Sequence, residues 1–259
     1  MNNLLLSNLT LLLAATFLLW LLSVKLRDAS IVDIFWGLGF VLVAWASYAQ
    51  GGGAEPRGLL LGVLVTIWGV RLAAHLFRRN HGKGEDYRYQ SLRKRIGPGF
   101  WWISLFVVFV FQGLLIWIIS LPLQLAQATR TPAHLTWLDG LGCAAWLIGF
   151  IFESVGDWQL TEFRANPNNH GKVLEHGLWR YTRHPNYFGD ALLWWGLWLI
   201  ALAAPVSWLT VISPLLMTLL LIKISGVALL EKTLSQSKPG YQEYIQRTSA
   251  FIPWLPKKR

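Results

Sequence analysis

Long apolar runs alternate with short charged segments along this chain. Seven runs are close to the length that crosses a bilayer as a helix, and they cover residues 4–24, 30–50, 58–77, 101–121, 137–157, 190–204 and 206–231. The run at 190–204 is the shortest. Because backbone groups in lipid find no water to bond, a chain with this pattern forms helices there. The pattern predicts an all-α membrane protein, built as a bundle of seven transmembrane helices.

The distribution of basic residues gives this bundle an orientation. Of the 23 Lys and Arg residues, nineteen lie in segments on one side of the predicted membrane, and only Arg57 and Arg130 lie on the other. The two that remain, Arg71 and Lys223, are inside predicted spans. The positive-inside rule places the richer side in the cytoplasm. We therefore expect the N-terminus outside and the C-terminus in the cytoplasm.

Composition agrees with this class of protein. Hydrophobic residues make up 54% of the 259 positions and charged residues 14%, whereas soluble domains carry about 25% charged residues. The net charge of +10 follows the orientation and suits anionic lipid headgroups rather than nucleic acid. The lone Cys143 excludes an intrachain disulfide, and no His or Cys pair has metal-ligand spacing. No repeat or linker divides the chain, so we expect one membrane-embedded domain over residues 1–259.

The densest polar segment is GLWRYTRHPNYFGD, which begins at Gly177 and runs into the sixth predicted span. Arg180, Arg183 and His184, with Lys172 just upstream, suit a phosphorylated ligand. A positively charged cytoplasmic flank is the alternative, because many membrane proteins carry one for orientation alone. Orientation needs only loosely placed Lys and Arg, so the fixed His-Pro-Asn-Tyr sequence favours a binding site.

Asp33 is the carboxyl group placed well inside the second predicted span. Burial favours the protonated form of such a group, which makes Asp33 a candidate proton donor. Alternatively it lies close enough to the interface to be wetted, or it pairs with Arg27 or Arg71.

Three other predicted spans bring polar side chains to their cytoplasmic halves. They are Arg71, His75, Arg78 and Arg79 in the third span, Glu153, Asp157 and Arg164 in the fifth, and Lys223 and Glu231 in the seventh. This convergence predicts a ligand-filled cavity open to the cytoplasm. The chain has neither a dinucleotide-binding glycine motif nor a phosphate-binding loop. An anionic nucleotide held by Arg, Lys, Asn and Tyr is therefore expected, and the block Gly84-Glu85-Asp86-Tyr87-Arg88-Tyr89 supplies more groups of this kind.

Several motifs occur together over nearly the whole chain. They are Asp33-Ile-Phe-Trp-Gly37, the run from Trp68 to His75, GEDYRY from Gly84, Glu153 with Asp157, Gln159 and Arg164, the segment from Gly177, and Ser225-Gly226 before Glu231, followed by Tyr241 and Tyr244. This set resembles the DUF1295 group of bacterial membrane proteins, within the superfamily of steroid 5-alpha-reductases and sterol reductases. The resemblance implies a seven-span enzyme of a bacterial inner membrane that binds NADPH on the cytoplasmic side and a steroid-like lipid within the membrane.

The resemblance also implies a reaction and roles for residues. In such reductases hydride passes to the β-carbon of an enone, while a carboxyl group and a phenol polarise the carbonyl oxygen. The carboxyl role falls on Asp33, and the phenol comes from Tyr87 or Tyr89, because Trp68 stands where the family has its Tyr. The nucleotide-binding roles fall on Arg164, Lys172, Arg183, His184, Asn186, Tyr187 and Asp190. Further candidates for holding the cofactor are Arg71, Arg78, Arg88, Glu153, Asp157, Trp179, Arg180, Lys223 and Glu231.

Two other classes stay open. A methyltransferase using S-adenosylmethionine on a prenyl or phospholipid substrate carries a motif like RHPNY, but its cofactor has no phosphates to need the basic residues. A non-enzymatic lipid-binding or transport protein is the other, although no inverted repeat supports transport. The expected partners are thus a steroid-like small molecule and membrane lipids, with no nucleic acid, no metal and no obligate protein partner.

Overall fold

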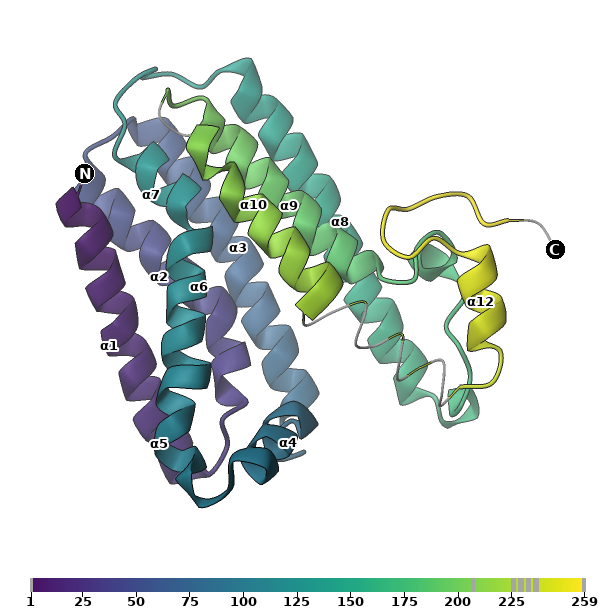
Figure 1. Ribbon diagram of the computed structural model, residues 1–259. Helices are drawn as coiled ribbons and strands as arrows, with labels where there is room; N and C mark the ends of the chain where they lie inside the picture. The colour runs from purple at the N-terminus through teal and green to yellow at the C-terminus, as the bar shows by residue number, and fades with distance from the viewer. Residues whose placement is uncertain are drawn as a thin grey trace. The chain divides into compact units, whose positions relative to one another are not determined.

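The computed structural model describes residues 2–205, 208–224, 227, 231, 234 and 238–257 (Figure 1). Over these residues the regular elements are all helices, and one isolated β-bridge joins Thr182 to Ser249. The chain forms two compact units, Met1–Thr136 with Ala201–Thr210, and Trp137–Ile200 with Val211–Arg259. The expectation of a single domain stays a prediction.

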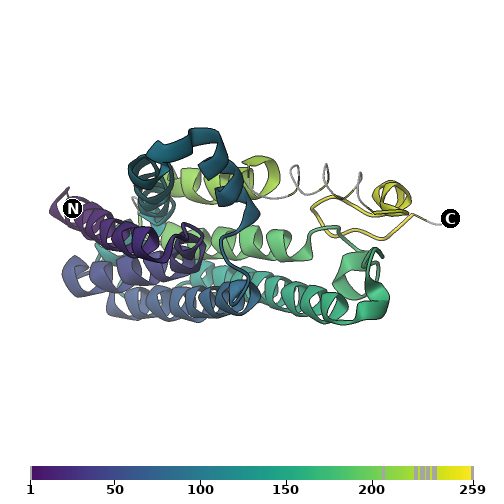
Figure 2. The same ribbon diagram turned by 90° about the horizontal axis from the view of Figure 1, so that it is seen from below.

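The first unit is built from helices joined by short turns. They are α1 (Asn2–Leu26), α2 (Ile31–Gly51), α3 (Glu55–Asn80), α4 (Tyr87–Ile96), η1 (Gly97–Gly99), α5 (Phe100–Ser104), the π-helical η2 (Leu105–Val110), α6 (Phe111–Ile119) and α7 (Leu121–Gln127). In Figures 1 and 2, α1, α2 and α3 lie side by side. Helix α6 packs against α1 and α2, and the unit is therefore a layered helical bundle.

Helices α2 and α3 pack closely against each other in this unit. A Cβ atom at Gly37 would lie 2.6 Å from the backbone oxygen of Gly69, and one at Gly69 would lie 2.6 Å from that of Gly37. Small residues facing each other let two backbones pack in contact, which is a common way to join helices in lipid. Near the N-terminus of α1, buried Asn8 donates hydrogen bonds to Ser47 (2.8 Å) and Gln124 (3.0 Å), which join α1, α2 and α7.

The second unit contains α8 (Trp137–Ala165), η3 (Pro167–Asn169), η4 (Gly177–Arg180), α10 (Ile212–Leu219), the π-helical η6 (Leu220–Ile224) and α12 (Tyr241–Arg247). It also contains α9 (Pro185–Leu202) up to Ile200 and the last residue of η5 (Trp208–Val211). Helices α8 and α9 pack through glycines that recur every seven residues. A Cβ at Gly149 would meet the Leu193 nitrogen at 2.5 Å, and one at Gly189 would meet the Glu153 nitrogen. The spacing of Gly142 and Gly149 on α8 matches that of Gly189 and Gly196 on α9, so one face of each helix is smooth over two turns.

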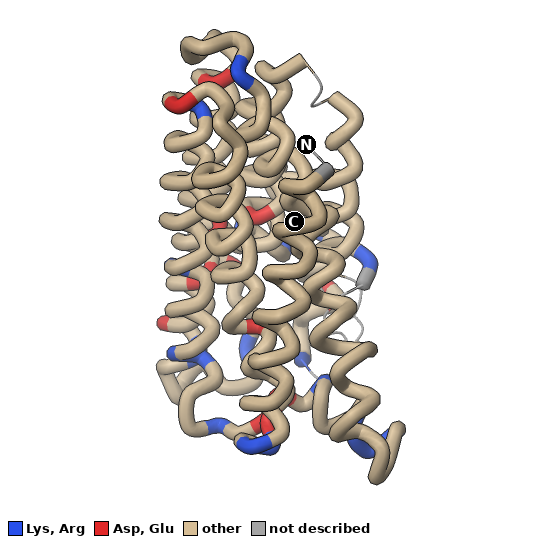
Figure 3. Tube along the Cα trace, turned by 90° about the vertical axis from the view of Figure 1, so that its left-hand side faces the viewer, with Lys and Arg blue, Asp and Glu red and all other residues tan. Residues whose placement is uncertain are grey.

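In the part of the chain that the structure describes, five helical segments are long and apolar enough to cross a membrane: Asn3–Leu26, Ile31–Gly51, Glu55–Asn80, Tyr87–Ile119 and Trp137–Ala165. They coincide with the first five predicted spans to within two residues, except that the segments around the third, fourth and fifth spans extend beyond them. Long stretches of the helices carry no charged residue, as Figure 3 shows. The sixth predicted span (190–204) corresponds to α9, which begins at Pro185 and ends at Leu202. Parts of the seventh (206–231), Ser225 and Gly226 included, fall outside the described residues. The count of seven and the orientation stay predictions.

Arg57 and Arg130, the two basic residues predicted on the side of the membrane with few Lys and Arg, form hydrogen bonds that join loops. Arg57 is buried and donates to the carbonyl oxygens of Pro132 (3.0 Å) and His134 (3.1 Å), and Arg130 donates to that of Gly52 (3.1 Å). These two exceptions to the charge bias thus have a structural role in the first unit.

Candidate functional site

In the first unit, Asp33 on α2 accepts hydrogen bonds from two residues of α4. The hydroxyl of Tyr89 donates to Oδ1 at 2.7 Å, and the guanidinium of Arg88 donates to Oδ2 at 2.5 Å. The amide of Gln112 in α6 donates to the Tyr89 oxygen at 3.2 Å. We call Asp33, Asp86, Arg88, Tyr89 and Gln112 the carboxylate–phenol cluster. In this geometry Asp33 accepts from both residues, and the Tyr89 hydroxyl is the donor of the Asp33–Tyr89 pair.

The local sequence explains why α4 presents these groups. Asp86 precedes the helix and its carboxylate accepts from the Arg88 backbone N–H at 3.0 Å, which is the typical bond of a helix N-cap. The same carboxylate accepts from Arg88 Nε at 2.9 Å, so it also holds the guanidinium. Burial alone would raise the pKa of Asp86, but the hydrogen bonds and charge of Arg88 outweigh it and hold this pKa below 3.8.

Tyr89 is buried among apolar side chains, while its neighbour Tyr87 is exposed. The Tyr89 ring belongs to a core that includes Val32 and Phe109, whereas 59% of Tyr87 is exposed. Of the two phenols expected from the sequence, the structure places Tyr89 beside Asp33. The partners of Asp33 are Arg88 and Tyr89, rather than Arg27 or Arg71.

In the second unit, the RHPNY segment is joined to Glu231 through two side chains. Arg183 Nε donates to Glu231 Oε1 at 2.7 Å, and His184 Nε2 lies 3.3 Å from the same oxygen. Arg183 and His184 are both buried. We call these three residues the arginine–glutamate cluster.

The C-terminal residues pack onto this cluster. Arg183 Nη1 donates to the carbonyl oxygens of Ile245 (3.1 Å) and Thr248, and the Arg183 N–H donates to that of Ser249 at 2.9 Å. The Tyr244 hydroxyl donates to the Trp179 carbonyl oxygen. Burial, together with the nearby Glu231 carboxylate, raises the pKa of Tyr241 to about 12, so that it stays neutral. The guanidinium of Arg183 is therefore committed to protein groups.

A second polar pair lies at the start of α9. Asn186 Nδ2 donates to Asp157 Oδ1 at 2.9 Å, and Asp157 on α8 is buried. The Asn186 side-chain oxygen is buried too, and no described residue donates to it. Tyr187 stacks on His184 with a centroid distance of 5.6 Å. The pair thus presents one amide acceptor, Asn186 Oδ1, with the amide plane fixed by Asp157.

A pocket of about 410 Å³ opens beside η4 in the same unit. It is lined by Glu175, His176, Gly177, Arg180, Arg247, Thr248, Pro256 and Lys257. Arg247 binds Glu175 at 2.8 Å, and three cations against one carboxylate leave the pocket positive. Such a lining suits a phosphate group.

Comparison with known proteins adds the family. The family described as "Protein of unknown function (DUF1295)" matches residues 19–248, which is most of the chain. The chain belongs to the DUF1295 family. An uncharacterized protein of Schizosaccharomyces pombe is 25% identical to it over 275 residues, covering 92% of this chain and 76% of the relative. No solved structure matches the chain.

The sequence-predicted residues of this DUF1295 protein fall into three groups. Asp33, Arg88 and Tyr89 come together in the first unit; Asp157 pairs with Asn186, and Arg183, His184, Tyr187 and Glu231 gather in the second. Trp179 is buried against Gly156, whose carbonyl accepts from its indole at 3.1 Å, and Glu153 and Asp190 are buried. Exposed positions are Tyr87, Arg78, Arg164, Lys172, Arg180 and Lys223, while Arg71 is half-buried. That both sets line one cavity stays a prediction.

Gln112, Arg247 and Lys257 were not anticipated as members of these sites, and Asp86 was anticipated only as a carboxylate of the GEDYRY block. Gln112 is a lone amide in an apolar span, a signal that could have marked it. Asp86 sits three residues before Tyr89 in the GEDYRY block, where an N-cap is expected. Arg247 and Lys257 belong to the basic C-terminal segment and had no local signal. Among the described residues no group of three or more His, Cys, Asp or Glu could hold a metal ion.

Proposed function

We propose that this DUF1295 protein is an NADPH-dependent reductase of a carbon–carbon double bond conjugated to a carbonyl group in a steroid-like or other lipid. The observation that carries the proposal is the Asp33–Tyr89 pair. In it a buried phenol donates a hydrogen bond to a carboxylate, within a helical bundle whose surface is largely apolar. A phenol held in this way is a hydrogen-bond donor with no exposure to bulk water, as the reduction of an enone needs.

The carboxylate–phenol cluster supplies the electrophilic half of the reaction. The Tyr89 hydroxyl can turn about its C–O bond from Asp33 towards the carbonyl oxygen of an enone. Gln112 donates to the same hydroxyl oxygen and keeps the ring in place, while Arg88 keeps Asp33 fixed. Negative charge develops on the carbonyl oxygen when hydride adds to the β-carbon, so a donor at this point stabilises the transition state more than the bound substrate.

The residues of the second unit fit the cofactor. Asn186 offers a buried acceptor without a described donor, which suits the carboxamide N–H of nicotinamide. Arg180, Arg247 and Lys257 line a pocket with room for a phosphate and its sugar, and such cations favour NADPH over NADH through the 2′-phosphate. When bound, the cofactor would supply the hydride. The buried Arg183 does not contact the cofactor in this proposal, because its guanidinium joins the RHPNY segment to Glu231 and to the C-terminal residues.

The reaction is tested by NADPH oxidation with a 3-oxo-Δ4 steroid as surrogate substrate. Tyr89→Phe removes the donor alone and is expected to lower turnover by roughly 10²–10³-fold with little change in NADPH affinity. Tyr48→Phe, which removes a phenol from the same helix as Asp33, is the matched control and should retain turnover. If Tyr87→Phe lowers turnover and Tyr89→Phe does not, the donor role belongs to Tyr87.

The cofactor is tested by titrating the purified protein with NADPH, NADH and S-adenosylmethionine. We expect NADPH to bind more tightly than NADH, and Arg180→Ala to weaken NADPH about tenfold, because a hydrogen bond to a charged group contributes about 1.5–3 kcal/mol. Arg95→Ala, which removes an exposed cation of the first unit, is the control. Equal affinities for the two nicotinamide cofactors, or tight binding of S-adenosylmethionine, would overturn the assignment.

A further inference from the structure

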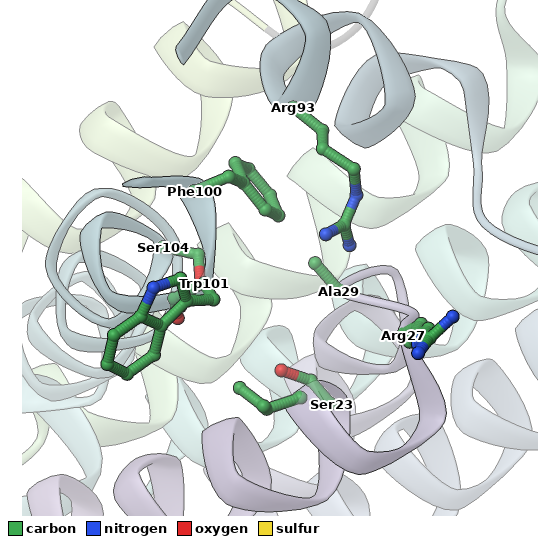
Figure 4. Close-up of a pocket in the computed structure, with 8 residues that line it drawn as sticks. Ser23, Arg27, Ala29, Arg93, Phe100, Trp101 and Ser104 are labelled. Atoms are coloured by element: carbon green, nitrogen blue, oxygen red, sulfur yellow. The ribbon is translucent and has the colours of Figure 1, made fainter. Parts of the chain in front are cut away.

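A second pocket, of about 260 Å³, lies in the first unit where α1 ends and α5 begins. Its lining residues are Ser23, Val24, Arg27, Ala29, Arg93, Phe100, Trp101 and Ser104. In Figure 4, Arg93 and Phe100 face Ser23 and Ala29 across this space. The pocket takes no part in the reductase proposal.

Arg27 has an unusual backbone conformation for its residue type. It follows the last residue of α1 with a φ of 54°, and among the described residues it is the one non-glycine with positive φ. Its N–H donates to the Val24 oxygen (3.3 Å) and the Asp28 N–H donates to the Ser23 oxygen (3.0 Å), which is the Schellman pattern that glycine normally completes. An arginine at a position better suited to glycine indicates that its side chain is needed.

The side chain of Arg27 is available to a ligand. It is exposed, and no described residue forms a hydrogen bond or ion pair with its guanidinium. Arg93 lies on the other side of the pocket, where its Nε and Nη2 bind Glu85 and its Cζ lies 4.3 Å from the centre of the Phe100 ring. Arg93 Nη1 is not used in these bonds. The pocket thus offers donors from two cations, as a phosphate requires.

Two serines give the pocket acceptors. The Ser23 hydroxyl donates to the Trp20 oxygen (2.8 Å) and the Ser104 hydroxyl donates to the Trp101 oxygen (3.1 Å). Both serines line the pocket. Because each hydroxyl proton is already used, the serine oxygens remain as acceptors, which suit the hydroxyl groups of a ligand.

The surface beside the pocket is apolar and aromatic. Val24, Leu26 and Trp101 expose 40%, 55% and 56% of their surface. Val24 and Leu26 lie at the end of the spanning segment Asn3–Leu26, and Trp101 lies in the spanning segment Tyr87–Ile119. Exposed Trp is typical of the level of the lipid headgroups.

We propose that this pocket binds the headgroup of an anionic phospholipid with headgroup hydroxyls, phosphatidylglycerol. Its phosphate lies between Arg27 and Arg93, its glycerol hydroxyls donate to Ser23 and Ser104, and its acyl chains run along Val24 and Trp101. Basic pockets between spanning helices bind anionic headgroups in other membrane proteins.

The test measures the melting temperature of the full chain in nanodiscs of phosphatidylcholine with and without phosphatidylglycerol of the same acyl chains. A ligand that binds the folded state raises the melting temperature, and we expect a rise of roughly 3 °C or more in the wild-type protein. Arg27→Gly removes the cation and suits the left-handed backbone, so it should fold at least as stably in pure phosphatidylcholine and lose the rise. Lys25→Gln, which removes a nearby exposed cation outside the pocket, should keep it.

Several results would overturn the proposal. They are the absence of a rise in the wild-type protein, a rise that survives in Arg27→Gly, and an equal loss in Lys25→Gln, which would indicate diffuse attraction to the anionic surface. Inorganic phosphate or glycerol 3-phosphate added to phosphatidylcholine nanodiscs should not reproduce the rise. If either does, the site binds a free anion and the lipid assignment is wrong.

Discussion

Arg180 and Arg183 lie three residues apart in the same motif, but their side chains have different surroundings. Arg180 is exposed at the edge of the basic pocket. Arg183 is 7% exposed and donates to Glu231 and to two carbonyl oxygens. Sequence reasoning gave both a phosphate contact, because residue type alone cannot distinguish a cation that faces a ligand from one that joins two segments.

We predict opposite effects for the two alanine variants. Arg183→Ala removes one partner of a buried ion pair and should lower the free energy of unfolding by about 3 kcal/mol. Arg180→Ala should leave stability within about 0.5 kcal/mol and weaken NADPH binding. Chemical denaturation followed beside cofactor titration separates them, and an unchanged stability of Arg183→Ala would contradict the structural role.

Asp86 gives the first unit a dependence of stability on pH. Its pKa is below 3.8 in the folded state. The contribution of this carboxylate is therefore present above pH 4 and is lost as the pH falls through the folded-state value. We predict that Asp86→Asn lowers stability at pH 7 by about 1 kcal/mol or less, because the amide still caps α4, and that it reduces the loss of stability below pH 4. Thermal melts between pH 3 and 7 measure both effects, and identical profiles for the two proteins would disprove the assignment.

At the scale of helices, the packing of α8 on α9 depends on glycines at particular positions. A methyl group at Gly149 would meet backbone atoms of α9 at 2.5 and 2.6 Å, whereas one at Gly140 of the same helix would meet nothing within 4 Å. The two positions share a helix and differ in what they face.

We predict that Gly149→Ala destabilises the protein by roughly 2 kcal/mol, because backbone atoms cannot move aside as a flexible side chain can. Gly140→Ala is the matched control and should be neutral or stabilising by up to about 1 kcal/mol, since alanine favours a helix. Equal melting temperatures for the two variants would show that α8 and α9 do not pack at this distance in the membrane.

The apolar runs predicted the helices well, because lipid leaves a backbone few alternatives. The GEDYRY block and Asp33 were both recognised as polar groups with a role. Their pairing could not be predicted, since Asp33 and Arg88 are 55 residues apart and the choice among Arg27, Arg71 and Arg88 depends on how α2 and α4 pack. The same holds for Glu231, whose partner at position 183 becomes apparent only when the C-terminal segment is in place.

At the scale of the whole molecule, the predicted orientation can be tested with introduced cysteines. The chain has one native cysteine, Cys143, and Cys143→Ala provides the background. In sealed cells, a membrane-impermeant maleimide should label Ala133→Cys from outside and leave Lys94→Cys unlabelled until the membrane is opened. Both positions are exposed in the first unit. The reverse pattern would place the basic loop outside and contradict the positive-inside assignment.

The attachment of the C-terminal segment to the RHPNY motif has a consequence for biosynthesis. Thr182 and Arg183 bond to residues 245–251, and Trp254 donates to the Tyr181 carbonyl oxygen at 2.9 Å. On the ribosome, residues 180–187 emerge well before these partners exist. Until about seventy more residues have been translated (the separation of Tyr181 and Trp254 along the chain), Arg183 must remain hydrated at the membrane surface or associate with another protein. A chain truncated by a premature stop codon before residue 231 would keep its apolar spans but expose an unpaired arginine and histidine, which a quality-control protease could recognise.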